Sequence, residues 1–247
     1  MEEKRRFEVT SMGLHLMAMV FMLCDHLWAT VVDGNDWLTC VGRLAFPIFA
    51  FMIVEGYFHT RDLKKYVKRM LLFALISEIP FDLMTAGGLF YPLHQNVMFT
   101  FLLSIGLIWL NEDAKRRGNK VVIVLAGIST VILGYLLGTF TFVDYYYAGP
   151  LTVLAFYFFR GRKWWCYLGQ FAALWFINLE LLGGLVYYVE LFGTEVRIVQ
   201  QGLALLALIP IWLYRGKQGY HSKWFQYTCY AFYPVHLLVL ALLQMLI

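Results

Sequence analysis

The chain has 247 residues, of which 61% are hydrophobic and 15% are charged, whereas soluble domains contain about 45–50% and about 25%. This composition cannot supply the polar shell of a soluble globule, so it excludes a soluble enzyme, a disordered chain and a secreted disulfide scaffold. The net charge of +4 comes from short cationic clusters between apolar runs, a pattern typical of membrane topology and not of nucleic-acid binding.

Long apolar runs predict an all-α, polytopic transmembrane bundle of about nine spans, or roughly eight to ten, in a single domain over residues 1–247. A span needs about 20 apolar residues to cross ~30 Å of hydrocarbon. Segment 181–193 is too short and glycine-rich for a span, so we expect a re-entrant or interfacial piece, or the tail of its neighbour. The expected spans lie near residues 9–32, 44–60, 66–86, 95–111, 120–139, 145–160, 164–180, 198–214 and 226–247.

Cationic residues occur in alternate connections between these spans. They gather at 2–6, 60–69, 111–120, 160–163 and 214–223, whereas 32–41, 86–95 and 141–149 contain almost none. The positive-inside rule therefore predicts a cytoplasmic N-terminus and a multi-pass protein of the cell's inner or plasma membrane. The first apolar run has no cleavage pattern behind it, so we expect it to remain as the first span.

Ionisable side chains within the spans are the candidates for chemistry, because each costs at least ~2.5–3.5 kcal/mol on insertion scales. In the first span Asp25 and His26 are adjacent, so they point about 100° apart on a helix and cannot face one partner. We expect one of them to face a polar cavity and the other to bind a second helix. The alternative is a structural histidine packed against a backbone carbonyl.

The second span carries polar groups at two depths, with Arg43 at its outer end and Glu55 ~18 Å further along the helix. His59 follows Glu55 by one turn on the same face. The structural alternatives are a lipid headgroup contact for Arg43 and an interhelical clamp for the other two.

The third span holds Glu78 and Asp82 on either side of Pro80. Proline leaves the carbonyl near Ile76 without its helical partner. A kink with an unpaired carbonyl is not expected to face lipid. We therefore expect it either to face a polar cavity or to serve the packing of this helix against its neighbours.

Polar residues in the later spans complete two sets. Asn96 opens the fourth span, Tyr233 and His236 flank Pro234 near mid-membrane, and Gln200 and Gln201 are expected to bond across helices. A continuous polar path is the economical explanation for side chains that enter from both ends. The outer set is Asp25, His26, Arg43, Asp82 and Asn96; the inner set is Glu55, His59 and Arg69, with His236 assigned to it provisionally.

Several sequence blocks carry a resemblance to a known family. They are CDH at 24–26, GRLAFPIFAFMIVEG at 42–56, HT at 59–60, KRMLLFALISEIPFD at 68–82, the asparagine at 96, and YPVH at 233–236. These blocks resemble the TraX family, named for a conjugative-plasmid protein that acetylates the N-terminus of pilin. The resemblance covers nearly the whole chain, but residues 111–200 match only in hydropathy. That family is similar to integral-membrane acyltransferases such as the lysosomal enzyme that acetylates heparan glucosamine.

The resemblance implies transfer of an acetyl group from cytoplasmic acetyl-CoA to an acceptor on the far side of the membrane, with His26 at the centre. Acyl transfer needs a general base and donors for the developing oxyanion. His26 suits the base because imidazole titrates near neutral pH, and Asp25 is the second catalytic candidate if a partner brings it to the ring. Arg43, Asn96 or a backbone N–H at a kink are candidates for the oxyanion or acceptor.

The remaining expectations concern ligands. The acceptor is left open among a peptide N-terminus, a glycan and a small amine. Membrane lipids are expected partners, whereas nucleic acid and metal are not expected. A homo-oligomer is left open. Two other classes stay open, a proton-coupled small-molecule transporter and a non-catalytic scaffold or receptor. Substrate contacts are expected from Arg43, Glu55, His59, Glu78, Asp82, Asn96, Tyr233 and His236. Phosphates of coenzyme A are expected at Lys65, Lys68, Arg69 and Arg116, which serve equally well as topological anchors.

Overall fold

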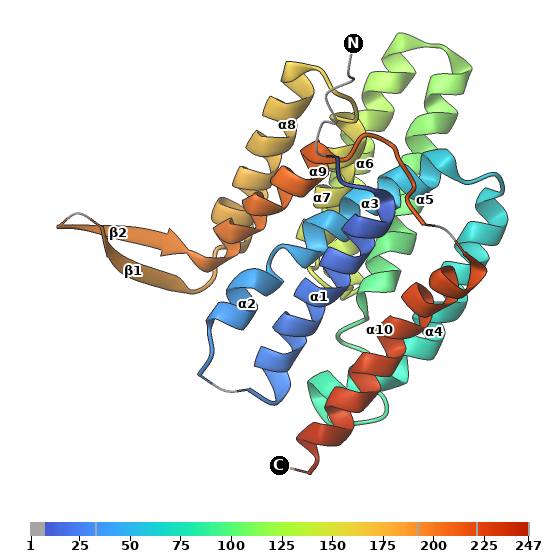
Figure 1. Cartoon of the computed structure of the whole chain (residues 1–247). Helices are drawn as coiled ribbons and strands as arrows, with labels where there is room; N and C mark the ends of the chain where they lie inside the picture. The colour runs from blue at the N-terminus through green and yellow to red at the C-terminus, as the bar shows by residue number, and fades with distance from the viewer. Residues whose placement is uncertain (1–7, 33, 192, 221, 247) are drawn as a thin grey trace, which may run out of the picture.

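The computed structural model describes residues 8–246 apart from 33, 192 and 221, so the predicted cationic cluster at 2–6 lies outside the described residues. Helices make up most of the fold (Figure 1). A π-helical turn, η1 (Phe176–Leu182), continues α8, and a 3-10 helix, η2 (Gln200–Ala207), precedes α9. The α-helices are α1 (Ser11–Thr30), α2 (Trp37–Gly42), α3 (Ala45–His59), α4 (Leu63–Ala86), α5 (Val97–Arg117), α6 (Lys120–Phe140), α7 (Ala148–Phe158), α8 (Trp164–Trp175), α9 (Leu208–Leu213) and α10 (Lys223–Gln244).

The apolar helices support a membrane protein. Among the described residues, five helical segments are long and apolar enough to cross a membrane, and α7 and the η2–α9 segment are shorter apolar helices. Each of the nine expected spans overlaps a helical segment. How many of these segments cross the membrane, and the cytoplasmic location of the N-terminus, stay predictions. The five long segments are Ser11–Thr30, Trp37–His59, Val97–Arg117, Lys120–Phe140 and Trp224–Gln244.

The two ends of the bundle differ in charge. The start of α1 and the connections that follow α3, α5, α7 and α9 lie at one end, at the top of Figure 1. Lysines and arginines gather in and beside these connections, so we call this the cationic end. The connections after α1, α4 and α6 lie at the opposite end, together with the C-terminus, and their residues 31–36, 87–96 and 141–147 include no lysine or arginine.

Local sequence signals set the helix boundaries. Asp62 caps α4 by accepting from the Lys65 N–H, and Asn96 caps α5 by accepting from the Met98 N–H. Helix α4 ends at Gly87, whose φ of 68° is in the left-handed region that glycine adopts without strain.

Two strands that the hydropathy pattern does not predict form a β-hairpin between η1 and η2. Strands β1 (Val186–Leu191) and β2 (Thr194–Val199) pair antiparallel from Val186–Val199 to Leu191–Thr194, and the hairpin projects from the side of the bundle (Figure 1). Residues 198 and 199, expected at the start of a span, belong to β2, and the hairpin is an exception to the all-α class in an otherwise helical fold. Of the alternatives expected for 181–193, the tail of the neighbour applies to residues 181 and 182, which end η1. Valine, isoleucine and tyrosine are frequent in this segment and favour strands, and the backbone groups that face the partner strand are paired.

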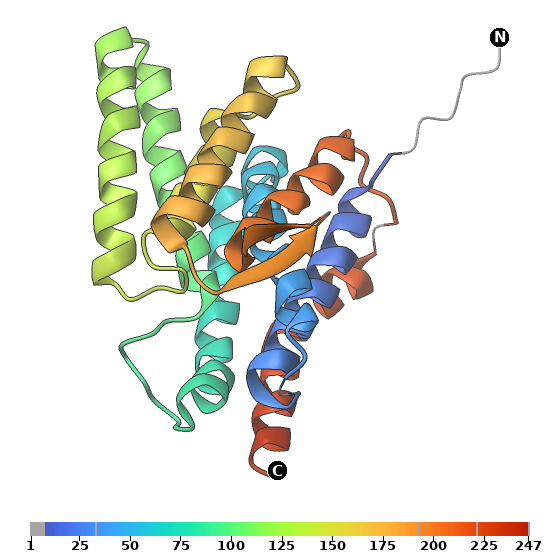
Figure 2. The same cartoon turned by 90° about the vertical axis from the view of Figure 1, so that its left-hand side faces the viewer.

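The core centres on α7, which is buried along most of its length, and on α3, whose buried residues lie between Ala45 and Val54. Helices α5 and α6 lie on one flank and α1 and α10 on the other, with α3 between them (Figure 2). A second apolar cluster joins α1, α4 and α10 around Phe81, Met84, Tyr233 and Leu237. These contacts hold the polar side chains of α1, α4 and α10 in fixed positions.

Candidate active site

Helices α1 and α10 bring together two histidines that are far apart in the sequence. Nδ1 of His26 lies 2.8 Å from Nε2 of His236, and the two rings are parallel to within 3°. Nδ1 of His236 lies 2.7 Å from the Phe232 carbonyl oxygen. His236 is buried and His26 is partly exposed. From the sequence His236 is assigned provisionally to the inner set, but the structure places it against His26.

Asp25 lies on a different side of α1 and binds Arg43. A guanidinium nitrogen of Arg43, Nη2, donates to Oδ1 of Asp25, and the Thr39 hydroxyl donates to the same oxygen at 2.8 Å. A Cβ atom at Gly42 would lie 2.4 Å from Cβ of Asp25, so only glycine permits this approach of the two helices. Asp25 is thus the partner of Arg43 and does not orient His26, in agreement with the angle between adjacent helical residues.

The network continues into η1 and η2. Nη1 of Arg43 donates to Gln201 Oε1 at 3.3 Å, and Nε2 of Gln201 donates to Asn178 Oδ1 at 2.9 Å. The interhelical bond expected of Gln201 is confirmed. Sequence reasoning missed Asn178 and Thr39, although a buried amide inside an otherwise apolar run is a signal that could have found Asn178.

Asn96 joins α5 to α4. Its side-chain nitrogen donates to the Glu78 carboxylate and, at 2.9 Å, to the Ala74 carbonyl oxygen. Its oxygen meanwhile caps α5. Because Pro80 removes one backbone donor from α4, this side-chain clamp helps to fix the helix near the proline.

Three carboxylates gather at the end opposite the cationic loops. Asp82 is 1% exposed; its Oδ2 accepts from the Tyr91 N–H at 2.8 Å, and its Oδ1 has no partner among the described residues. In the connecting loops, His94 Nε2 lies 3.4 Å from Asp144 Oδ1, and this hydrogen bond raises the pKa of His94. The charges of Glu78 and Asp82 act on His94 in the same direction.

A small apolar cavity of about 60 Å³ lies next to Phe232 and Tyr233, whose rings contact His236, but neither His26 nor His236 is among its lining residues. It reaches Phe232, whose ring stacks on His236 with centroids 4.6 Å apart. Along α1 the lining residues precede His26 at helical spacing, so they share its face of the helix. Residues of α1 and α10 that line the cavity are His15, Met19, Met22, Cys229, Phe232 and Tyr233.

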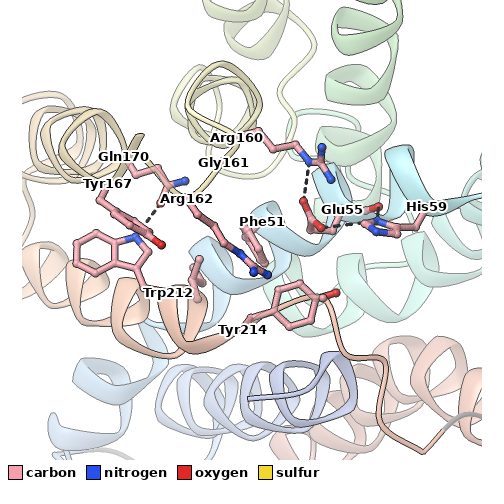
Figure 3. Close-up of a pocket in the computed structure, with 12 residues that line it drawn as sticks. Phe51, Glu55, His59, Arg160, Gly161, Arg162, Tyr167, Gln170, Trp212 and Tyr214 are labelled. Carbon is pink, nitrogen blue, oxygen red and sulfur yellow. Dashed lines mark hydrogen bonds and ion pairs between the residues drawn. The ribbon is translucent and has the colours of Figure 1, made fainter. Parts of the chain in front are cut away.

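A larger cavity of about 250 Å³ lies at the cationic end, between α3, α8, α9 and the α7–α8 connection (Figure 3). Nε of Arg160 donates to Glu55 Oε1 at 2.7 Å, and its guanidinium lies 4.3 Å above the Phe58 ring. Nδ1 of His59 is 3.6 Å from Glu55 Oε2. Glu55 therefore ties α3 to the α7–α8 connection, which is the clamp considered as its structural alternative.

The other wall of this cavity is aromatic and amide-bearing. The Trp212 indole N–H donates to Gln170 Oε1 at 2.8 Å, and Tyr167 meets Trp212 edge to face. Arg162 points between these residues and Phe51 (Figure 3), and it has no ion pair among the described residues. The charge pattern at 160–163 predicts only membrane topology, and nothing in the sequence indicates that Arg160 and Arg162 line a cavity.

The four cations expected to hold coenzyme A lie elsewhere. Lys65 is 3.4 Å from Asp62 at the start of α4, and Lys68 is exposed one turn later. Nε of Arg69 is buried without a partner in the described part of the chain, and Arg116 is exposed near the end of α5. None of the four lines either cavity.

Comparisons with known proteins match nearly the whole length of the chain. The family described as "TraX protein" matches residues 12–244. The curated protein "Probable fimbrial assembly protein FimC, serogroup H1" of Dichelobacter nodosus is 26% identical over 253 residues, which cover 98% of each chain. No solved structure matches the chain. Because the family match extends from α1 through α10 and includes both histidines and both cavities, the chain belongs to the TraX family.

Proposed function

We propose that this chain is a membrane-embedded acetyltransferase of the inner membrane, which moves an acetyl group from cytoplasmic acetyl-CoA to an acceptor on the extracytoplasmic side. One observation carries the proposal. Nε2 of His26 has no hydrogen-bond partner in the described part of the chain. It also differs from the fully buried polar atoms without a partner, because some of its surface is accessible. The other nitrogen of the same ring is held by His236. A fixed imidazole with one free, reachable nitrogen is what a general base requires.

In this proposal His26 removes a proton from the attacking amine or hydroxyl. The new bond forms at the acetyl carbonyl carbon and the carbon–sulfur bond breaks; the protonated His26 then gives its proton to the sulfur, so that the coenzyme leaves as its thiol and the imidazole is neutral again. Arg43 is the proposed donor to the oxyanion, because it is a cation that Asp25 and Thr39 hold in place, and Asp25 is next to His26 on α1. A preorganised cation at a developing oxyanion is a common source of rate enhancement.

For the donor we propose the cavity at the cationic end. Arg160 and Arg162 supply guanidinium groups, which suit phosphate, and Tyr167 and Trp212 supply flat faces for a base. The cavity volume of about 250 Å³ is below the ~300–1,000 Å³ of typical ligand pockets, so it would take the nucleotide end and not the whole molecule. The two cavities share no lining residue, so the continuous polar path stays a prediction.

For the acceptor we propose a positively charged amine. Glu78, Asp82 and Asp144 form an acidic group at the end opposite the cationic loops, and carboxylates attract an ammonium group before it loses its proton. The name of the Dichelobacter relative, a fimbrial assembly protein, supports the N-terminus of a fimbrial subunit as the amine.

The test is an acetyl-transfer assay with purified protein in detergent, labelled acetyl-CoA and a panel of short peptides with free N-termini. We expect labelled peptide and release of free coenzyme A thiol with the wild type, and neither with His26→Ala. Cys24→Ala is the matched control, because Cys24 lies two residues away on α1 and its thiol is free of any disulfide among the described residues. Full activity in His26→Ala would remove His26 from the mechanism. Retained solute flux without coenzyme A binding would favour a transporter.

A further inference from the structure

We infer that His236 is a positioning residue that selects the tautomer of His26 and thereby makes Nε2 the basic nitrogen. The inference rests on the proposed function, because it concerns the base of that reaction. His236 makes two ring-nitrogen contacts, and these give its two nitrogens opposite roles.

The first contact determines where His236 carries its proton. Its Nδ1 lies 2.7 Å from the Phe232 carbonyl oxygen, and a carbonyl oxygen can only accept. Nδ1 of His236 must therefore be the N–H donor. His15 and His59 make the same contact with the carbonyl four residues earlier, each at 2.8 Å, so helix geometry sets this proton position.

The second contact passes the constraint to His26. A neutral imidazole carries one N–H, so Nε2 of His236 is an acceptor once Nδ1 is the donor. The atom 2.8 Å from it, Nδ1 of His26, must then carry the hydrogen. Nε2 of His26 is left with a lone pair, and this nitrogen is the one without a partner in the described residues.

The opposite arrangement would require a doubly protonated His236. That cation would lie in a residue only 7% exposed and packed against Phe232 and Tyr233, with no carboxylate bonded to it among the described residues. A buried charge without a paired counter-ion is strongly disfavoured. The neutral chain from the Phe232 carbonyl through His236 to His26 is therefore the stable one.

Packing holds His236 in the orientation that this role requires. The Phe232 ring stacks on the imidazole at 15° between planes, and Leu237 and Leu240 are buried beside it in the α1–α4–α10 cluster. When His26 takes up a proton at Nε2, the Nδ1 hydrogen bond to His236 also stabilises the imidazolium, as a triad carboxylate does.

A substitution series separates this role from a structural one. Glutamine at 236 can place its Oε1 near the position of Nε2 and accept from His26, whereas asparagine reaches only the position of Nδ1, and leucine accepts nothing. We expect His236→Gln to keep kcat within about threefold of the wild type, and His236→Asn and His236→Leu to lose about 10–100-fold. The KM for acetyl-CoA should be unchanged in all three, because the proposed donor cavity contains no residue of α10.

Nitrogen-15 spectra of histidine-labelled protein in detergent test the tautomer without any activity. Assigned with His26→Ala and His236→Ala, they should show His26 protonated at Nδ1 and bare at Nε2 near neutral pH, and a mixture of tautomers in His236→Leu. A wild-type His26 protonated at Nε2, or equal kcat in His236→Leu and His236→Gln, would overturn the inference. An active His26→Ala with the expected spectrum would instead refute the proposed function.

Discussion

The Asp25–Arg43 pair allows the catalytic and structural parts of the account to be separated. The two side chains are each 19% exposed, and Arg43 donates to acceptors on Asp25, Thr39 and Gln201. Removing one member leaves the other as an unpaired, mostly buried charge. The perturbation we consider is Asp25→Leu, Arg43→Met and the two combined.

Breaking a fully buried pair costs about 3–5 kcal/mol, and we place each single variant at about 2–4 kcal/mol because a fifth of each side chain reaches solvent. Replacing both charges with apolar groups removes the unpaired charge as well, so the double variant should lie within ~1 kcal/mol of the wild type. The two changes are therefore expected to be strongly non-additive, as for residues in direct contact.

The assay is SDS-induced unfolding in mixed micelles, measured beside acetyl transfer. The double variant should unfold like the wild type yet lose about 10²–10³-fold in kcat, the range for loss of one oxyanion donor. Single variants as stable as the wild type would refute the buried-pair reasoning. A stable double variant with normal kcat would remove Arg43 from the mechanism.

Other regions of the molecule give three further expectations. Arg162→Gln should raise the KM for acetyl-CoA about tenfold in steady-state assays, whereas Arg61→Gln at the same end should not; equal effects would contradict the proposed donor site. Gly42→Val should destabilise the fold by about 1–3 kcal/mol in the SDS assay, because its Cβ overlaps α1. The pKa of His94 is raised in the folded state, so its bond to Asp144 stabilises the fold fully below the unfolded-state pKa of ~6.5. This stabilisation is lost as pH rises through the folded-state pKa of His94. Unfolding measured at several pH values should show the loss in the wild type and not in Asp144→Asn.

Hydropathy predicted much of the architecture because long apolar runs have few alternatives to helices in a bilayer. Each of the nine expected spans overlaps a helical segment, and the cationic loops lie at one end. The hairpin at 186–199 was missed because a search for 20-residue apolar runs treats its valines and tyrosines as weak span residues. Their preference for strands becomes visible only at the scale of six residues.

The candidate site was predictable in composition but not in pairing. Insertion cost singled out His26, Arg43 and His236, and the angle between adjacent helical residues correctly separated Asp25 from His26. Nothing in the sequence indicates that residues 210 positions apart share a hydrogen bond. Charge counting also cannot distinguish Arg162, which lines the larger cavity, from Lys68, which lines neither cavity.

Reconstitution into sealed vesicles shows whether this protein carries an acetyl group across a membrane. Protein oriented with its cationic end outward receives labelled acetyl-CoA outside, while a peptide with a free N-terminus is trapped in the lumen. Label should accumulate on the lumenal peptide with wild-type protein and with Cys24→Ala, and it should be absent with His26→Ala. Equal labelling of the trapped peptide by His26→Ala, or no labelling by the wild type, would contradict a transmembrane acetyl transfer centred on His26.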